Sequence, residues 1–539
     1  MDRRATIRTT GAVYTPPAVA SAILDFLWHL LPDRPLQVLE PSVGDGAFLR
    51  ELERSSLGVH HYTLVDIDEA VINDLELQLN GSAATFVRSD FTRFAIDYQS
   101  SGNTPFDLLV GNPPFIRKHN FSMEFKENLA AFSEAFNYPL ADLKNSWAAF
   151  LVAAAELVSA DGIVALILPY EIMTVEYGQK LLEHVQRAFR RIDIFISDAK
   201  AFREIEQDAV VFVGQKSCSD DQAGTFIRRV SSFTDLALAP THKITLSADH
   251  RGLELSGFLL PEGALTAIRE IRSATGRLSD FADSAPGIVS AANEFFILSQ
   301  LDTEAHELDE YVLPILKKGS LAGSSPIFSE SDFAQLTERE ACWFLAIKGE
   351  RAELSEKLQT YIAAGEQRGF HLRYKCRHRK RWYEVPVVKV EQGFFFKRSH
   401  SIPRVIINEA RAYVTDTAYG LRMKEGYSIR GLCFSFYTSL TMLFAELDGR
   451  FYGGGVLELS PKEFRGLPII YHEPSDAEWE AFLGSHEAAV GDPNKILDFG
   501  DQRLRERGAF TARQLEVLRH AWKIVRAHRM RHGGRKATI

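Results

Sequence analysis

An Asn-Pro-Pro-aromatic tetrapeptide, Asn112 to Phe115, directly follows an apolar run and has the residue types needed to activate a conjugated amine. Such an amine is a poor nucleophile because its lone pair is delocalised into a ring. The Asn112 side-chain oxygen and the Pro113 carbonyl are two acceptors that would localise this lone pair, and the paired prolines fix the backbone direction. Phe115 would stack on a base extruded from a duplex. The tetrapeptide therefore predicts group transfer to the exocyclic amine of a nucleobase.

A glycine loop and two acids precede the tetrapeptide, each at the end of an apolar run. The loop is Glu40-Pro-Ser-Val-Gly-Asp-Gly46, and its two glycines allow a ligand to approach the backbone closely. Asp66 ends the second run, where an acid can accept hydrogen bonds from ribose hydroxyls. Asp90 and Phe91 end the third, where an adenine ring would lie. The loop lacks the full GxGxxG signature because residue 49 is leucine, which favours a mononucleoside-like cofactor over a dinucleotide.

Short apolar runs alternate with helical stretches from about residue 17 to residue 213. The runs predicted to be strands are Gln37–Glu40, Tyr62–Asp66, Thr85–Val87, Phe106–Val110, Ile163–Leu168, Arg191–Ile196 and Ala209–Val213. Apolar strands joined by helices, such as Pro17–Leu31 and Ser146–Ser159, indicate a mostly parallel sheet covered on both faces. We predict an α/β fold with a Rossmann-like domain over residues 1–240, a mixed and mostly parallel sheet, and ligands at the carboxyl ends of its strands.

The second half of the chain is less regular. Residues 217–249 are polar and are predicted to form a linker. Short β-like runs follow, among them Phe295–Leu298 and Arg404–Asn408. We predict a separate α+β domain over residues 250–475 and a C-terminal helical segment over residues 476–539.

The chain of 539 residues carries a net charge of −9, so a nucleic-acid surface must be a local basic patch. The clearest patch is Arg368–Trp382, in which aromatic residues alternate with cations that could contact phosphates and read guanine edges. The alternative is a solvated charged face. A second basic stretch, Lys523–Lys536, is expected to be an ordinary charged helix and tail. The cations predicted to contact DNA are Arg373, Lys375, Arg377, Arg379, Lys380 and Arg381.

Cysteine usage and hydropathy exclude several classes of protein. The four cysteines form no CxxC pair, so we expect no metal site and no disulfide framework. No apolar run reaches the ~20 residues that a membrane span needs, and the first residues lack the apolar core of a signal peptide. We expect a cytoplasmic protein.

The order of these motifs resembles the gamma class of adenine DNA methyltransferases, in particular the TaqI-like type with a C-terminal target recognition domain. The resemblance is specific over about Ala12–Gln215 and implies S-adenosylmethionine as cofactor and adenine N6 as acceptor. Asparagine rather than serine at position 112 favours adenine over cytosine N4. Many members carry tyrosine at position 115, where phenylalanine keeps the stacking and loses a hydroxyl contact.

The resemblance also assigns roles to individual residues. The catalytic residues that it implies are Asn112, Pro113, Pro114 and Phe115. Phe115 and Phe202 would stack on the two faces of the flipped base. The cofactor-binding residues would be Tyr14, Thr15, Pro16, Glu40, Pro41, Gly44, Gly46, Asp66, Ile67, Asp90, Phe91, Asn112 and Phe150.

Other classes share parts of this pattern. Enzymes that methylate protein glutamine carry an Asn-Pro-Pro-aromatic motif, but they are usually much shorter and have no large C-terminal domain with a basic strip. RNA adenine methylation and a catalytically idle DNA-binding scaffold are further alternatives. We see no Asp…Glu-x-Lys nuclease site in the second half. We therefore favour a modification enzyme that acts on double-stranded DNA, serves restriction-modification or phage defence, and has a separately encoded nuclease or defence-system subunits as partners.

Overall fold

The chain forms two compact units in the computed structural model, which describes residues 13–55, 58–78, 83–199, 202, 208–236, 241–244, 259–260, 262–452, 454–489 and 491–531. The first unit comprises Met1–Pro261, Tyr452–Gly455 and Met530–Ile539, and the second comprises Glu262–Phe451 and Val456–Arg529. The predicted boundary at residues 240–250 thus lies close to the observed one. The predicted helical segment 476–539 is not separate, because most of it belongs to the second unit.

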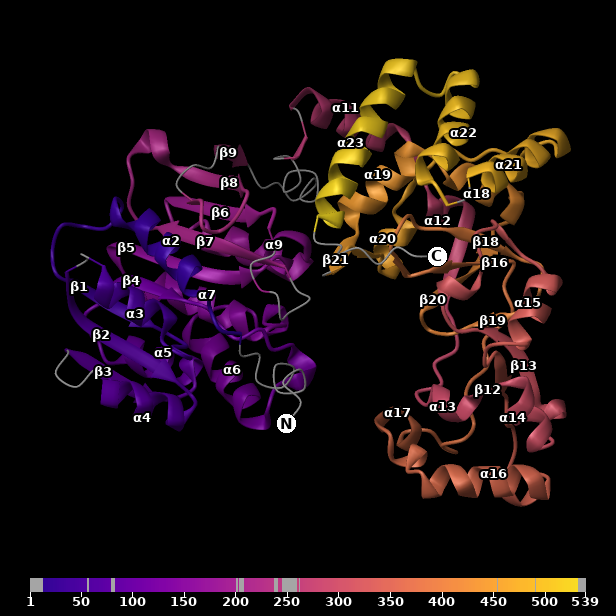
Figure 1. Ribbon diagram of the computed structural model, residues 1–539, viewed down its shortest axis with the longest axis horizontal. Helices are drawn as coiled ribbons and strands as arrows, with labels where there is room; N and C mark the ends of the chain where they lie inside the picture. Colours follow the sequence, from indigo (N-terminus) through magenta and orange to yellow (C-terminus); the bar gives the residue numbers. More distant parts are fainter. Residues whose placement is uncertain are drawn as a thin grey trace. The chain divides into compact units, whose positions relative to one another are not determined.

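The first unit is built around a nine-stranded sheet with the order β3-β2-β1-β4-β5-β7-β6-β8-β9 (Figure 1). Strands β3, β2, β1, β4 and β5 are parallel. Strand β7 is antiparallel to β5 and β6, β6 is parallel to β8, and β8 is antiparallel to β9. The predicted strands and the mixed, mostly parallel sheet are confirmed. The strands are β1 (Leu36–Glu40), β2 (Val59–Asp66), β3 (Ala84–Arg88), β4 (Phe106–Gly111), β5 (Val158–Pro169), β6 (Arg191–Ser197), β7 (Ala209–Gln215), β8 (Gly224–Val230) and β9 (Thr241–Ile244).

The helices of this unit are apolar where they cover the sheet. Helix α7 buries all of its residues except Glu156, as a helix enclosed by protein does, and it runs directly into β5. Strand β4 is buried at every position. The helices are α2 (Pro17–Trp28), α3 (Ala47–Arg54), α4 (Glu69–Gln78), α5 (Phe91–Ser100), α6 (Met123–Ala135), α7 (Ser146–Leu157), α8 (Glu171–Thr174) and α9 (Glu176–Val185).

The order of the strands reverses between β1 and β4. From β1 the chain continues to β2 and β3 on one side, whereas β4 leads to β5 on the other. Connections that diverge in this way leave a crevice at the carboxyl ends of the two strands. The glycine loop follows β1 and the Asn-Pro-Pro-Phe tetrapeptide follows β4, so the topology places both motifs at this crevice.

The predicted linker over residues 217–249 is wrong, because part of it belongs to the sheet. Strand β8 pairs with β6, and β9 pairs with β8. Arg191 of β6 and Arg228 of β8 both form ion pairs with the buried Asp193. These ion pairs explain why a segment with charged residues can lie in a sheet.

The second unit combines small sheets with helices, as expected for an α+β domain. Its sheets have the orders β11-β20-β16-β18-β14, β12-β15-β13-β19, β17-β22-β21 and β10-β23. Their strands are β10 (Gly276–Arg277), β11 (Ala282–Pro286), β12 (Ile297–Leu298), β13 (Val312–Leu316), β14 (Ile327–Phe328), β15 (Trp343–Leu345), β16 (Gly393–Phe396), β17 (Arg398–Ser399), β18 (Val405–Asn408), β19 (Tyr413–Val414), β20 (Ala418–Met423), β21 (Arg450–Tyr452), β22 (Val456–Glu458) and β23 (Pro468–Ile469).

None of the helices in the described ranges has the length and apolarity that crossing a membrane requires. The helices of the second unit are α11 (Glu262–Ala274), α12 (Leu278–Phe281), α13 (Asn293–Phe296), α14 (Gln300–Ala305), α15 (Glu330–Thr337), α16 (Glu356–Gln367), α17 (Tyr374–Arg377), α18 (Ile429–Phe436), α19 (Ser439–Asp448), α20 (Pro461–Arg465), α21 (Asp476–Ala489), α22 (Pro493–Glu506) and α23 (Ala512–Met530).

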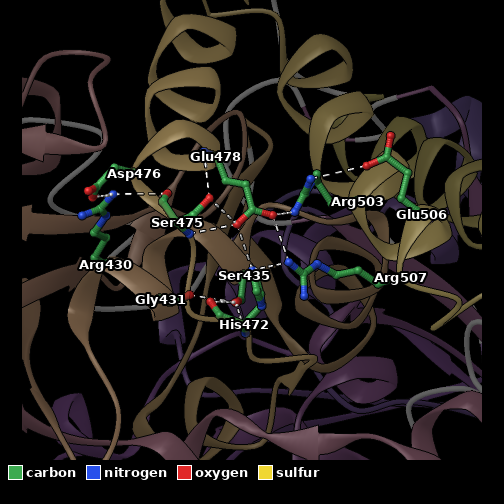
Figure 2. Close-up of polar contacts among 10 residues, drawn as sticks. All are labelled: Arg430, Gly431, Ser435, His472, Ser475, Asp476, Glu478, Arg503, Glu506 and Arg507. Atoms are coloured by element: carbon green, nitrogen blue, oxygen red, sulfur yellow. Dashed lines mark hydrogen bonds and ion pairs between the residues drawn. The ribbon is translucent and has the colours of Figure 1, made fainter.

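Glu478 joins the C-terminal helices of the second unit through a polar network (Figure 2). Its carboxylate on α21 forms an ion pair with Arg503 of α22 and another, at 2.9 Å, with Arg507 just beyond that helix. It also accepts hydrogen bonds from the backbone and hydroxyl of Ser475, at 2.8 and 2.9 Å. The same side chain thus caps its own helix and holds the next one.

Changing Glu478 to glutamine is expected to lower the free energy of unfolding of the second unit by about 1–3 kcal/mol, because two arginines lose the charge that they share. Urea unfolding measures this change. Glu480→Gln provides the matched control, since Glu480 is exposed on the same helix. Equal stability of the two variants would show that the network adds nothing to the packing of α21 against α22.

Candidate active site

A cavity of about 490 Å³ lies at the carboxyl ends of β1 to β4 in the first unit. Most of the residues predicted to bind a cofactor line it, although they come from distant parts of the chain. The lining residues among them are Tyr14, Thr15, Glu40, Pro41, Gly44, Asp66, Ile67, Asp90, Phe91, Asn112 and Phe150. The structure therefore collects these predicted positions at one site, whereas Pro16 and Gly46 do not line the cavity.

The glycine loop turns from β1 into α3 with two residues in the left-handed region. Gly44 has φ +53° and Gly46 has φ +73°, conformations that favour glycine. The Gly44 amide donates a hydrogen bond of 2.9 Å to Oδ2 of Asp66, and the Asp68 amide donates one of 2.9 Å to Oδ1. Asp66, the last residue of β2, thus holds the glycine loop that follows β1. The contacts with ribose hydroxyls predicted for Asp66 would use the remaining lone pairs of its carboxylate.

One carboxylate oxygen of Asp90 caps a helix, and the other can accept a hydrogen bond from a ligand. Its Oδ1 caps helix α5 by accepting hydrogen bonds from the backbone of Thr92, at 2.9 Å, and from the Thr92 hydroxyl. Within the described part of the chain, the hydrogen bonds to this carboxylate all end on Oδ1, so Oδ2 is left to accept from a ligand. Phe91 stacks on Phe150 with ring centroids 4.5 Å apart, and both rings line the cavity. Together these residues form an aromatic wall beside an acceptor, which suits an adenine ring with its amine.

The cavity is strongly acidic. Its lining includes Glu40, Asp45, Asp66, Asp68, Asp90 and Glu124 and, among the described residues, no lysine, arginine or histidine. A ligand held mainly by phosphates would be repelled here, whereas a ligand with positive charge would be attracted. The charge of the lining therefore favours a cationic ligand.

Glu40 is the most deeply buried of these acids. It is 2% exposed, and its Oε2 has no hydrogen-bond partner in the described part of the chain. Burial raises the pKa of the Glu40 carboxyl well above its usual range, and the neighbouring Asp45 raises this pKa further. The backbone of Leu49 forms a hydrogen bond with this carboxyl, but a buried carboxylate with one oxygen unpartnered is still costly, so a cationic group of a ligand would stabilise it.

The Asn112 side chain is oriented by the segment that precedes α2. Its Nδ2 donates a hydrogen bond of 2.8 Å to the Val13 carbonyl and lies 3.2 Å from the Thr15 hydroxyl. A carbonyl can only accept, so this contact fixes which end of the amide is nitrogen. The other end, Oδ1, is thereby left as an acceptor for a substrate. Thr15 supports this arrangement, and it was predicted only as a cofactor contact.

The first three carbonyls of the tetrapeptide differ in their hydrogen bonding. The Asn112 carbonyl accepts a hydrogen bond of 3.2 Å from the Ser42 hydroxyl, and the Pro114 carbonyl accepts one from Ser146. The Ser146 hydroxyl also accepts from the Ile116 amide at 2.9 Å. Among the hydrogen bonds of the described residues, none ends on the carbonyl between them, that of Pro113. Two serines thus fix the loop while the Pro113 carbonyl keeps its acceptor capacity.

The two predicted stacking rings lie in different surroundings. Phe115 is half-buried next to the loop and does not line the cavity. Phe202 is 6% exposed and belongs to the hydrophobic core of the sheet, which also contains Phe195 and Val211. Residues 203–207 lie outside the described residues. Phe115 is thus partly accessible and Phe202 is not, and the stacking roles of both residues stay predictions.

Sequence reasoning missed one wall of the cavity. Phe121 precedes helix α6, and Phe125 and Asn128 lie on it, three residues apart and therefore on one face. Their rings and amide line the same cavity as the glycine loop. The spacing of Phe125 and Asn128 was a usable signal for a shared helix face, but nothing local related that face to the glycine loop. Ser146 gave no local signal at all.

The predicted basic strip of the second unit divides into two groups. Arg379 donates hydrogen bonds to the carbonyls of Val289, at 2.7 Å, and Ser290, at 2.9 Å, and burial lowers its pKa. Arg381 forms ion pairs with Glu384 at 2.6 Å and with Glu350. These two arginines are occupied by their own unit, which corrects the prediction that the whole strip is available to a partner.

The other cations of the strip are exposed. Lys375, Arg377 and Lys380 form no ion pair within the described part of the chain, whereas Arg373 forms one of 2.8 Å with Glu294. Of these cations, Lys380 lines a cleft of about 640 Å³, together with Lys348, Arg379 and Arg381. These exposed cations remain candidates for phosphate contacts.

Comparison with known proteins gives two family matches. The model of the Eco57I restriction-modification methylase matches residues 50–202. The model of the C-terminal domain of the Type II methyltransferase M.Eco57I matches residues 254–503. The first match includes the tetrapeptide and most of the cavity, and the second includes the basic strip.

Two curated relatives match most of the chain. The Type II methyltransferase M.AccI of Acinetobacter calcoaceticus is 21% identical over 470 residues, which cover 84% of this chain and 83% of the relative. The Type II methyltransferase M.XamI of Xanthomonas campestris pv. amaranthicola is 22% identical over 474 residues, or 85% of each chain. Among solved structures, the Type IIL restriction-modification enzyme MmeI in complex with DNA has a TM-score of 0.56 and 12% identity, covering 98% of this chain and 80% of that one. This last likeness concerns the fold.

Proposed function

We propose that this chain is an Eco57I-like restriction-modification methylase and that it transfers a methyl group from S-adenosylmethionine to N6 of adenine in DNA. The observation that carries the proposal is the orientation of Asn112, whose Nδ2 is held by the Val13 carbonyl. This contact leaves Oδ1 as an acceptor beside the Pro113 carbonyl, which is the pair that a conjugated amine requires. The relatives M.AccI and M.XamI are Type II methyltransferases, which supports the same reaction class.

The residues of the cavity fit S-adenosylmethionine. Its sulfonium and ammonium groups are cations, and the lining is acidic, with Glu40 lacking a partner at Oε2 in the described part of the chain. The stacked rings of Phe91 and Phe150 would form a wall against its adenine ring, and Oδ2 of Asp90 would accept from the amine of that ring. The cofactor supplies an electrophilic methyl group when it is bound.

The protein's contribution to the reaction is to orient the target amine. Oδ1 of Asn112 and the Pro113 carbonyl would each accept one N–H of the adenine amine, which turns its lone pair towards the methyl group. The amine becomes acidic only as the new bond forms, so weak acceptors suffice to take up the developing charge. Ser42 and Ser146 hold the loop carbonyls on either side, and this fixes the geometry before substrate binds.

The target base must leave the duplex to reach these acceptors. Unstacking a base costs a few kcal/mol. Phe115 follows the acceptors directly and is half-buried, so its ring is available to stack on the flipped base. Stacking of this kind is worth about 1–3 kcal/mol, which offsets much of the cost.

The second unit would hold the DNA. Its match to a methyltransferase C-terminal domain and its exposed cations support double-stranded DNA over a protein glutamine as substrate. A modification enzyme of this family would protect DNA in restriction-modification or phage defence, with a separately encoded nuclease or defence-system subunits as partners.

Labelled methyl transfer to purified DNA, RNA and protein tests the substrate class. We expect label in duplex DNA and only background in the other two, with Asn112→Ala as the inactive control. Uptake by RNA or protein in place of DNA would leave the cofactor assignment intact and overturn the substrate assignment.

A further inference from the structure

Two large side chains with apolar surface project into solvent from a basic segment of the second unit. This segment, residues 370–378, is called the tip segment here and includes α17, which lies with α16 at the end of the unit away from α22 (Figure 1). Leu372 is 66% exposed and Tyr374 is 70% exposed. Large apolar residues are rarely so exposed side by side unless they contact something.

The tip segment is firmly anchored in spite of this exposure. Phe370 is buried, with its ring centroid 5.6 Å from that of Phe295, and Cys376 is completely buried. The two buried anchors therefore flank the exposed side chains along the segment. Because the anchors fix the backbone on both sides, Leu372 and Tyr374 have no local route into the core.

The surroundings of these side chains identify the kind of partner. Between Glu366 and Glu384 the chain contains no acidic residue but seven lysines and arginines, on a protein of net charge −9. Arg373, Arg379 and Arg381 have partners within the unit, whereas Lys375, Arg377 and Lys380 are exposed and form no ion pair among the described residues. The Arg377 guanidinium lies 5.4 Å from the ring centroid of Tyr374, so cationic and apolar groups adjoin. Lys375 is exposed between them and forms no ion pair in the described residues. The partner must therefore be a polyanion that also presents apolar or aromatic surface, and nucleic acid is such a polymer.

We propose that the tip segment is a DNA contact of two parts, in which Leu372 and Tyr374 contact base or sugar surface while Lys375 and Arg377 contact the flanking phosphates. This inference rests on the proposed DNA substrate and extends it to a contact that does not depend on charge. Apolar side chains of this kind can enter base steps, and tyrosine can stack on a base.

The two parts have different dependences on salt. Each phosphate contact releases counterions, so it contributes about 0.9 to the slope of log K against log salt concentration. Contact with base or sugar surface releases no counterions. Removing the apolar pair should therefore lower the affinity without changing the slope, and removing the cations should lower the slope itself.

The test measures the affinity of the full chain for a duplex that it methylates, over a series of salt concentrations. We expect Leu372→Ala/Tyr374→Ala to bind at least about fivefold more weakly with an unchanged slope. Lys375→Gln/Arg377→Gln should reduce the slope by about 1.8. Leu301→Ala is the matched control, since Leu301 is 76% exposed in the same unit on α14, beside Asp302 and Glu304. It should bind like the wild type.

The outcomes separate this inference from the proposed function. If the wild type methylates and binds DNA but the Leu372/Tyr374 variant matches the Leu301 control, the tip contact is overturned and the proposed function stands. If the wild type does not bind DNA, the proposed function fails first. If the same variants instead lose binding to anionic phospholipid vesicles and keep DNA binding, the partner assigned to the tip segment is wrong.

Discussion

Replacing Asn112 with alanine is expected to lower kcat for methyl transfer by at least about 10³-fold while the cofactor affinity stays nearly unchanged. Alanine removes Oδ1, the acceptor whose position the Val13 carbonyl and Thr15 hydroxyl determine through Nδ2. The adenine amine would then lose one of its two acceptors and keep its lone pair in the ring. Single-turnover kinetics measure the transfer step, and titration calorimetry measures cofactor binding.

A matched variant separates chemistry from disruption of the fold. Thr15→Val removes one of the two contacts of Nδ2 and retains Oδ1, so it should lower the rate far less than Asn112→Ala. Equal rates for Asn112→Ala and the wild type would remove Asn112 from the mechanism. A loss of cofactor binding as large as the loss of rate would instead assign Asn112 to the binding site alone.

Changing Glu40 to glutamine is expected to have opposite effects on binding and stability. The cofactor Kd should rise about tenfold or more, because the carboxylate that meets a cationic group is lost. The unfolding free energy of the cofactor-free protein at neutral pH should increase, because the buried wild-type carboxyl must either carry a charge or keep a proton that the unfolded chain releases, and glutamine avoids both costs. Calorimetry gives the first quantity and urea unfolding the second. Glu124→Gln is the control, since Glu124 lines the same cavity but is exposed and screened by solvent.

The effect of Glu40 on stability has a defined dependence on pH. Burial raises the pKa of this carboxyl in the folded protein, so the folded state keeps the proton to a higher pH than the unfolded chain. The stability that the protonated Glu40 carboxyl contributes to the folded protein is fully present below the unfolded pKa of about 4.3. This contribution is lost as the pH rises through the folded pKa. The advantage of Glu40→Gln over the wild type should therefore grow with pH. A constant difference across this range would contradict the raised pKa.

The fold of the first unit was largely predictable because buried parallel strands read as continuous apolar runs. Strand β4 is buried at every position, and the runs in β1 and β5 are similarly apolar. Strand β8 was missed because its arginines suggest a polar segment, while the buried Asp193 that pairs with Arg228 lies elsewhere in the chain. A contact of that kind depends on the tertiary structure and leaves no local pattern.

The candidate site was predictable where a motif and its strand end coincide. The glycine loop, Asp90 and Asn112 all line the cavity, and each follows a strand directly. The wall formed by α6 was missed because its position depends on how that helix packs. The sequence also did not show how exposed each side chain would be. It gave no sign that Phe115 is half-buried while Phe202 lies in the core, or that Arg377 is exposed while Arg379 bonds to its own unit.

The identity of the methylated nucleoside tests the central claim most directly. Duplex DNA would be incubated with the wild-type protein and isotopically labelled S-adenosylmethionine, digested to nucleosides and analysed by mass spectrometry. The geometry of Asn112 and Pro113 predicts labelled N6-methyladenine and none in the Asn112→Ala reaction. Label in N4-methylcytosine or in a C5-methylated base, or equal label from both proteins, would contradict the account.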